Sequence, residues 1–336
     1  MELRARTQTL ELGETFAIAR GERLEQDVVL VELEHDGVVG SGEAAPIDYW
    51  GETMDSALAF LVEEAPGLLG ADPFALEAIG RRLGSRPGEQ AAKAALDAAL
   101  HDWVGKRLGL PVWRLLGLER GAPPTSYTIG IDSIEGTARR TRAARGFRAL
   151  KVKVGGPEDL PRLEAVRAEA DVPIRVDANE GWTLDAAREL MPELVRLGVE
   201  LIEQPFPAPD HESFRGLREV PGVPPLVVDE GLRELRDIPE IGSYADGVNV
   251  KLEKAGGSRN AIRMIHAARA LGLRVMIGCM IGSELGIAPG AQISSLADHV
   301  DLDGHLLLAS SPYRGLELSD GVVLPSSEPG LGVMAS

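Results

Sequence analysis

Cysteine is almost absent from this sequence, and long apolar runs are missing altogether. Cys279 is the only cysteine, so no disulfide can form within the chain, which fits a reducing compartment. No apolar run is long enough to cross a bilayer, and the first residues lack the apolar core of a signal peptide. We therefore expect a cytoplasmic protein that does not span a membrane.

Positive charge is also in short supply. The chain has 35 basic and 52 acidic residues, which give a formal net charge of −17. Nucleic acids and anionic membranes would repel such a surface, so neither is expected as a partner. A small-molecule substrate remains the expected partner.

Lysine is the scarcest of the charged residues. Arginine supplies 29 of the 35 basic residues, and only six are lysine. Four of the six lie in two short segments, Lys151-Val-Lys153 and Lys251-Leu-Glu-Lys254. Lysine can lose its proton near neutral pH in a suitable environment, whereas arginine cannot. The segments therefore suggest bases, and chance clustering of surface lysines is the alternative.

Charged residues follow short apolar runs at a regular interval. Lys153, Asp177, Glu203 and Asp229 are 24, 26 and 26 residues apart, and Lys251 follows 22 residues later. About 25 residues is the length of one strand, one helix and two loops. The pattern predicts parallel strands joined by helices, each strand placing a charge at its carboxyl end. Barrel enzymes and open α/β enzymes have their active sites at this end.

Eight segments read as such strands, with helical patterns between them. They are residues 125–130, 149–154, 173–177, 200–203, 226–229, 247–251, 274–278 and 299–302. Eight parallel strands favour a closed barrel over an open doubly wound sheet. The chain has neither a Gly-x-Gly-x-x-Gly nor a Walker loop to support the open sheet.

An α+β domain is expected before the barrel. Asp36-Gly37 separates two alternating runs, as in a β-hairpin, and helical patterns follow. Residues 16–23 read as a loop that leads into this hairpin. The expected divisions are a capping domain, a barrel and a terminal segment that returns to the cap, at 1–122, 123–311 and 312–336.

Asp177, Glu203 and Asp229 end three consecutive strands and should converge at the barrel mouth. Crowded carboxylates repel one another unless a cation neutralises them. Oxygen ligands without histidine or cysteine favour Mg²⁺, and Mn²⁺ could substitute. The alternative for each residue alone is a helix cap or an ion pair with arginine.

Lys153 and Lys251 flank these carboxylates in the chain and would face a bound substrate from opposite sides. A lysine beside Mg²⁺ and beside a second cation such as Lys151 would have a lowered pKa and could act as a base. Two bases on opposite faces permit epimerisation. One base and one stabilising cation permit elimination or cycloisomerisation, so the residues alone leave the reaction open.

These motifs together resemble the enolase superfamily, in its muconate lactonizing enzyme subgroup. The resemblance spans the chain, from Gly42-Glu43-Ala44-Ala45-Pro46 to the Lys-x-Lys, Asp-x-Asn, Glu-Gln-Pro, Asp-Glu and Lys-x-x-Lys-x-Gly-Gly motifs of the barrel. It implies a TIM-like (β/α)7β barrel under an N-terminal α+β capping domain. It also implies Mg²⁺ on the three carboxylates and general bases at Lys153 and Lys251, with Lys251 favoured over Lys254.

Asp301-Leu-Asp303 resembles the Asp-x-Asp motif of dipeptide epimerases, whose carboxylates bind the α-ammonium of an L-Ala-L-Xaa substrate. The resemblance also implies substrate contacts at Lys151, at Thr128 and around Cys279 and Ile281. It implies Mg²⁺-dependent inversion of the second residue through an enolate. The alternatives are o-succinylbenzoate synthase, N-succinylamino acid racemase and muconate cycloisomerase, or a barrel that only binds.

Relatives acting on Ala-Glu carry an arginine in a cap loop. Gly21 aligns there, with Arg20 and Arg23 beside it, while Asp48 in a second cap loop could favour another side chain. Many relatives carry a glutamate where this chain has Gly282, two residues before Glu284. The second residue of the dipeptide, the pathway and the assembly stay open, and dimers and octamers are common in the superfamily.

Overall fold

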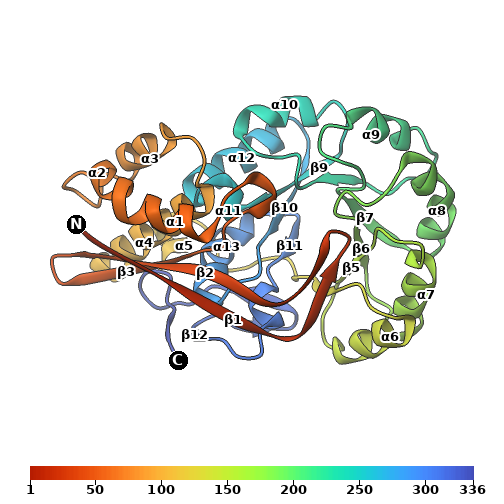
Figure 1. Ribbon diagram of the computed structural model, residues 1–336, viewed down its shortest axis with the longest axis horizontal. Coiled ribbons are helices and arrows are strands. Elements are labelled where there is room, and N and C mark those ends of the chain that lie inside the picture. Colours follow the sequence, from red (N-terminus) through yellow and green to blue (C-terminus); the bar gives the residue numbers. More distant parts are fainter.

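The computed structural model describes residues 1–336 and consists of a capping part beside a barrel (Figure 1). The cap contains a three-stranded antiparallel sheet in the order β1-β2-β3 and a group of helices. The sheet strands are β1 (Glu2–Ile18), β2 (Gly21–His35) and β3 (Val38–Ala44). The expected hairpin around Asp36-Gly37 is confirmed, because β2 and β3 pair from Val29–Ala44 to His35–Val38.

The prediction of a loop over residues 16–23 is wrong. β1 and β2 stay paired as far as Ile18 and Gly21, so only Ala19 and Arg20 form the turn. Continued antiparallel pairing satisfies the backbone hydrogen bonds of this segment. The hairpin is therefore long, and its tip reaches from the cap to the barrel, where Ile131 N donates to Ala17 O at 2.8 Å (Figure 1).

The cap helices pack on one face of this sheet. The main elements are α1 (Met54–Ala59), a π-helical segment (Phe60–Glu64), α2 (Ala65–Leu69), α3 (Leu76–Gly84), α4 (Gln90–Leu108) and α5 (Val112–Leu115). Thr53 begins α1 with a capping box, in which it and Ser56 bond to each other's backbone N–H. α4 is buried on nearly all sides, since it lies between the sheet and the barrel.

Eight parallel strands form the barrel. They are β4 (Tyr127–Ile129), β5 (Leu150–Lys153), β6 (Ile174–Asp177), β7 (Val199–Glu203), β8 (Leu226–Val228), β9 (Gly247–Lys251), β10 (Arg274–Gly278) and β11 (His299–Asp301). Each neighbours the next in chain order. A parallel bridge between Thr125 and Val300 joins the two ends of the sheet, so the predicted strands and the predicted closed barrel are confirmed. Asp229 directly follows β8 instead of ending it.

Helices cover the outside of the barrel (Figure 1). They are α6 (Ile134–Ala143), α7 (Asp159–Glu169), α8 (Leu184–Arg196), α9 (His211–Arg218), α10 (Ile238–Ile241), α11 (Leu252–Ala255), α12 (Ser258–Ala270) and α13 (Glu284–Ile293). The barrel strands and these helices share one core of 45 buried apolar residues. No helix of the protein has the length and apolar character to cross a membrane.

The C-terminal segment contains two short strand pairs and contacts α4 of the cap. β12 (Tyr313–Arg314) pairs with β15 (Met334–Ala335), and β13 (Glu317–Ser319) pairs with β14 (Val322–Leu324). Leu331 N donates to the Asp102 carboxylate of α4 at 2.8 Å. On these contacts we propose the division into residues 1–122, 123–311 and 312–336.

Candidate active site

Parallel register places three of the predicted residues side by side. Lys153 on β5 pairs with Asp177 on β6, which pairs with Glu203 on β7. Asp229 comes next, directly after β8. Because all strands of the barrel run in one direction, these carboxyl ends meet at one mouth. Asp177, Glu203 and Asp229 are buried there, with at most 1% of each residue exposed.

The two predicted bases lie on opposite sides of the barrel. Lys153 ends β5 and Lys251 ends β9, and four steps separate these strands in a ring of eight. Both lysines line one cavity at the mouth and are about nine-tenths buried. A small molecule held between them would present one face to each lysine.

Lys151 occupies the centre of a buried charge cluster. Its Nζ lies 2.9 Å from Asp177 Oδ2, 2.8 Å from Glu203 Oε2 and 2.8 Å from Asp301 Oδ2. Burial favours the neutral amine, but Asp177, Asp301 and Glu203 outweigh burial and raise the pKa of Lys151. Lys151 is therefore a fixed cation of the site, and its ion pairs tie β5 to β6, β7 and β11.

The three carboxylates do not gather around one point. Lys153 Nζ lies 2.7 Å from Asp177 Oδ2, whereas Asp229 is held by Lys251 at 2.7 Å and by Lys254 at 2.6 Å. No group of three Asp, Glu, His or Cys side chains is arranged to hold a metal ion. The expected convergence is incomplete because each carboxylate turns to its nearest ammonium group.

The donor set nevertheless fits a hard divalent cation. All three candidate side chains offer only oxygen. Glu203 Oε2 is buried and accepts no well-oriented hydrogen bond, although Lys151 Nζ lies 2.8 Å away. Burial, followed by the charge of Asp177, raises the pKa of Glu203 to about 7. A divalent cation would remove the repulsion that keeps this carboxyl partly protonated.

The pKa of Lys251 differs from expectation. Burial lowers it, but Asp229 outweighs burial and raises the pKa of Lys251 well above its ordinary value. From the sequence, a lowered pKa is expected for a lysine beside Mg²⁺ and a second cation such as Lys151. Here Lys251 takes up the charge of Asp229 itself. For Lys254, burial prevails and lowers the pKa.

Lys254 is held by contacts in the interior of the barrel. Its Nζ donates to the Asp229 carboxylate and to two backbone carbonyls, and the residue is 1% exposed. It does not line the cavity. The preference for Lys251 over Lys254 as the base facing a substrate agrees with this placement.

Two polar partners of the site were missed by sequence analysis. Asn249 Nδ2 donates to Glu203 Oε1 at 2.8 Å, and Ser126 Oγ donates to Asp301 Oδ1 at 2.7 Å. Asn249 lies two residues before Lys251 on β9, so strand alternation puts both side chains on one side. That spacing could have identified it. Ser126 precedes β4, and no comparable signal marks it.

Asp301 and Asp303 lie together on the other side of the mouth. Asp303 Oδ2 accepts a hydrogen bond from Thr128 N at 2.6 Å. Burial, followed by the nearby charge of Asp301, raises the pKa of Asp303 to about 7. The pKa of Asp301 is lowered, because Lys151 and hydrogen bonds outweigh burial. Asp303 thus lacks a cationic partner of its own.

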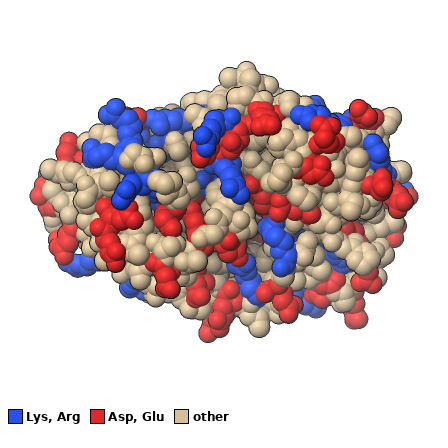
Figure 2. All heavy atoms as spheres, turned by 45° about the horizontal axis from the view of Figure 1, so that its top comes forward, with Lys and Arg blue, Asp and Glu red and all other residues tan.

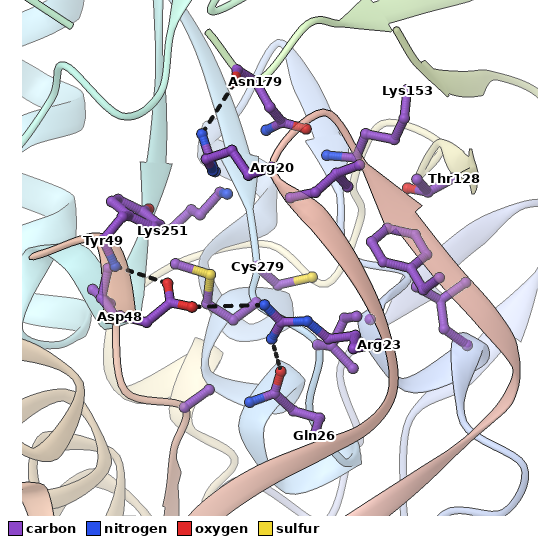
Figure 3. Close-up of a pocket in the computed structure, with 18 of the residues that line it drawn as sticks. Arg20, Arg23, Gln26, Asp48, Tyr49, Thr128, Lys153, Asn179, Lys251 and Cys279 are labelled. Atoms are coloured by element: carbon purple, nitrogen blue, oxygen red, sulfur yellow. Dashed lines mark hydrogen bonds and ion pairs between the residues drawn. The ribbon is translucent and has the colours of Figure 1, made fainter. Parts of the chain in front are cut away.

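A cavity of about 510 Å³ lies at the mouth under the cap, and the carboxylates Asp177, Glu203 and Asp229 are not among its lining residues. Its lining includes every predicted substrate contact, namely Thr128, Lys151, Cys279, Ile281, Asp301 and Asp303. The cap supplies the opposite wall from the β1–β2 hairpin and from the loop at Asp48 and Tyr49 (Figure 3). Burial raises the pKa of the Cys279 thiol well above its ordinary value, so this thiol is a neutral part of the wall.

The structure separates the roles of the two cap arginines. Arg20 Nη1 lies 2.6 Å from Glu230 Oε1 and is committed to the barrel. Arg23 also lines the cavity, where it donates to Gln26 Oε1 at 2.7 Å and lies 3.8 Å from Asp48 Oδ2 (Figure 3). Asp48 is largely exposed, so Arg23 is the arginine with a weakly held charge.

Glu284 has no place in the site. It begins α13, and its Oε2 accepts a hydrogen bond from Leu316 N at 2.9 Å. This bond fixes the C-terminal segment to the barrel. Glu284 therefore does not replace the glutamate that relatives carry two positions earlier.

The two parts of the chain match known domains. Residues 2–117 match the mandelate racemase / muconate lactonizing enzyme N-terminal domain, and residues 134–336 match the family described as enolase C-terminal domain-like. The chain belongs to the enolase superfamily, as an enzyme of its racemase and epimerase branch.

Relatives narrow the class to dipeptide epimerases. The chain is 38% identical to the L-Ala-D/L-Glu epimerase of Bacteroides thetaiotaomicron, over 97% of this chain and 85% of that protein. It is 37% identical to a hydrophobic dipeptide epimerase of Flavobacteria bacterium, over 96% of this chain and 95% of that protein. The substrate-liganded L-Ala-D/L-Glu epimerase of Bacillus subtilis superposes with a TM-score of 0.94 at 30% identity, over 100% and 98% of the two chains.

A further structure shows the ligands of a relative. The dipeptide epimerase of Enterococcus faecalis, complexed with Mg and L-Leu-L-Tyr, superposes with a TM-score of 0.92 at 30% identity. The superposition covers 99% of this chain and 98% of that one. The relatives differ in their dipeptides, so they leave the substrate of this chain undecided.

Proposed function

We propose that the protein inverts the α-carbon of the second residue of L-Ala-L-Xaa dipeptides in a Mg²⁺-dependent reaction. The observation that carries the proposal is the buried pair Asp301 and Asp303 at the end of β11, in which Asp301 pairs with Lys151 and Asp303 has no cationic partner. A dipeptide has a cationic amine at one end and a carboxylate at the other. The aspartate pair suits the amine, and muconate and succinylated substrates have no amine to bind there.

Proton transfer falls to the two lysines at opposite sides of the cavity. The lysine in its amine form removes the α-proton from one face, and the other, in its ammonium form, returns a proton on the opposite face. For the reverse reaction the two exchange roles. Burial of Lys153 and Lys251 excludes water that would otherwise return the proton to the first face.

Asp177, Glu203 and Asp229 would hold Mg²⁺, or Mn²⁺ in its place. When bound, the cation supplies charge that makes the α-proton of a carboxylate more acidic. It would also compete with Lys153 and Lys251 for Asp177 and Asp229, which frees these amines from their ion pairs. Lys151 would remain as the fixed cation between the carboxylates and Asp301.

For the second residue of the dipeptide we propose glutamate. Arg23 lines the cavity, and its partners Gln26 and Asp48 hold it only weakly, so a substrate carboxylate could replace Asp48. The similarity to the Bacteroides L-Ala-D/L-Glu epimerase supports this choice. The similarity to a hydrophobic dipeptide epimerase makes an apolar second residue the competing outcome.

The proposal is tested by incubating the purified protein with a dipeptide panel in D₂O with Mg²⁺. We expect α-deuterium incorporation and inversion at the second residue, fastest for L-Ala-L-Glu. Arg23→Gln should slow L-Ala-L-Glu and spare L-Ala-L-Leu. No exchange across the whole panel would sink the proposal, and turnover of N-succinylamino acids that survives Asp303→Asn would favour the racemase alternative.

Metal binding is tested separately from turnover. Isothermal titration with Mg²⁺ should detect one site, which Asp229→Asn weakens strongly because a carboxylate ligand is lost. The titration should also release protons from Glu203, since its pKa of about 7 must fall when a cation binds. Equal Mg²⁺ binding by the wild type and by Asp229→Asn would contradict the assignment.

A further inference from the structure

We propose that Arg20 is a positioning residue that seats both cap loops on the barrel loop after β8 and so holds Tyr49 in the wall of the reaction cavity. Arg20 would then act on every substrate alike, without binding the substrate side chain itself. The kinetic part of this inference rests on the proposed epimerase function, whereas its structural part does not.

The barrel contacts of Arg20 are unusually strong for a residue at a hairpin tip. Its Nη1 lies 2.6 Å from Glu230 Oε1, 3.2 Å from the Asn179 carbonyl oxygen and 3.3 Å from Glu180 Oε2. Glu230 is only 3% exposed and directly follows Asp229. Removal of the guanidinium would leave Glu230 buried without its countercharge, which a surface ion pair would not do.

The second cap loop, at residues 48–50, packs against Arg20 and against the barrel loop after β8. The Arg20 guanidinium lies 5.1 Å from the centre of the Tyr49 ring. Beside Tyr49, Trp50 lies under the guanidinium of Arg233, at 5.2 Å, and Arg233 belongs to the same barrel loop as Glu230. Cation–π contacts of this kind hold an aromatic ring in place. From the hairpin tip, Arg20 thus contacts both the second cap loop and the barrel.

Tyr49, which Arg20 contacts, has a polar group that forms no hydrogen bond within the protein. The Tyr49 hydroxyl is buried and has no hydrogen-bond partner. Tyr49 lines the cavity and lies near Lys251 (Figure 3). A buried hydroxyl without a partner costs free energy, so we infer that this hydroxyl bonds to the dipeptide when one is bound.

The backbone of the tip is fitted to the barrel as well. The Ala19 methyl group fills the space above two glycines, and a Cβ on Gly155 would come within 2.8 Å of it and one on Gly181 within 3.1 Å. Such close backbone packing gives the tip one seated position. Arg20, the next residue, fastens the tip in that position.

The experiment compares three variants. Arg20→Gln removes the guanidinium, and Arg20→Lys keeps a cation. Arg139→Gln is the matched control. Arg139 also joins the β1–β2 hairpin to the barrel, through two 2.9 Å contacts with Glu14. Its side chain is half exposed and has no contact with Tyr49. Hydrogen–deuterium exchange of residues 16–23 and 48–50 is measured without substrate, and kcat and KM are measured for L-Ala-L-Glu and L-Ala-L-Leu.

We expect Arg20→Gln to speed exchange in both loops and to lower kcat/KM for both dipeptides by a similar factor, about 100-fold. Arg20→Lys should recover part of both effects, and Arg139→Gln should change neither. Unchanged exchange in residues 48–50 would overturn the inference. So would a loss confined to L-Ala-L-Glu, which would make Arg20 a substrate-binding residue. If the wild type turns over no dipeptide, the exchange data still decide the role of Arg20.

Discussion

Most of the lysines of this protein lie at the barrel mouth. Four of the six lysines lie within hydrogen-bond distance of a carboxylate at the barrel mouth, the longest of these contacts being the 2.9 Å from Lys151 to Asp177. Arginine supplies 29 of the other 31 basic residues. Basic and acidic side chains are interspersed over the face shown in Figure 2. The chemistry of an amine that can gain and lose a proton explains this division.

Removal of either base should slow inversion of the α-carbon but leave exchange of the α-proton on one face. Lys153→Ala and Lys251→Ala should each slow inversion by about 10²–10⁴-fold. Each variant should still exchange the α-proton of one epimer of the dipeptide, and the two variants should differ in which epimer. Proton NMR in D₂O with each epimer measures this.

Lys106→Ala is the control for the lysine variants. Lys106 belongs to α4, pairs with Asp102 and is not among the residues that line the cavity. The Lys106→Ala variant should invert the dipeptide at the same rate as the wild type. If Lys153→Ala and Lys251→Ala exchange the same epimer, the two lysines do not face opposite sides of the substrate.

Asp303 should give the reaction a pH dependence. Its pKa of about 7 lies above the ordinary value, so the carboxyl is neutral at lower pH and attracts the substrate ammonium only after it ionises. We expect kcat/KM to rise with pH through about 7 and to fall again where the dipeptide amine deprotonates, near 8. Asp303→Asn should lower kcat/KM and remove the rising limb, and an unchanged rising limb would exclude Asp303 as its cause.

At the scale of elements, the cap depends on an unusually close approach of strand to helix. A Cβ on Gly42 of β3 would lie 2.0 Å from the Ala95 carbonyl oxygen of α4, and one on Gly40 would lie 2.0 Å from that of Ala99. Only glycine leaves room for the helix there. The packing holds β3 against α4, and β3 also carries Glu43 to the barrel.

Gly42→Ala should therefore destabilise the protein by about 1–3 kcal/mol, the range for overpacking. Gly80→Ala is the matched control, because Gly80 lies on the exposed face of α3 with no atom near its would-be Cβ. That substitution should stabilise by about 0.5–1 kcal/mol. Urea unfolding measures both. Equal stability of Gly42→Ala and the wild type would mean that β3 can shift away from α4.

At the scale of the whole molecule, a buried carboxyl group connects the cap to the barrel. Glu43 of β3 accepts a hydrogen bond from Ser283 N at 2.8 Å and another from the Ser283 hydroxyl, at the start of α13. Burial raises the pKa of Glu43 to about 7 despite both bonds. The folded protein therefore keeps a proton on Glu43 that the unfolded chain releases near pH 4.5.

This difference fixes the sign of a stability change with pH. Between pH 4.5 and about 7 the folded state binds more protons at Glu43 than the unfolded state, so this group's contribution falls as pH rises. The loss amounts to at most about 3 kcal/mol. Glu43→Gln removes this pH dependence. Urea unfolding of the wild type and of Glu43→Gln at pH 5 and pH 8 should show that the wild type loses more stability between the two pH values. His305, whose pKa burial lowers to about 4, acts in the opposite direction but equally in both proteins.

The sequence by itself determined the barrel and brought most of the proposed site residues to one end of it. Strands that alternate with helices at a constant interval must run in parallel, and parallel strands must place their carboxyl ends at one mouth. Lys153, Asp177, Glu203, Asp229 and Lys251 therefore fall together whatever the details of packing. The Asp301-Leu-Asp303 segment follows by the same reasoning, since it ends the eighth strand.

The tertiary structure alone decided which charged side chains are already held in ion pairs within the protein. Nothing in the local sequence distinguishes Arg20 from Arg23, yet one is held by the buried Glu230 and the other lines the cavity with weak partners. Likewise Lys254, three residues after Lys251, is held by the Asp229 carboxylate. The Arg20–Glu230 contact joins residues 210 positions apart. Pairing energies also depend on burial, which the sequence pattern does not contain.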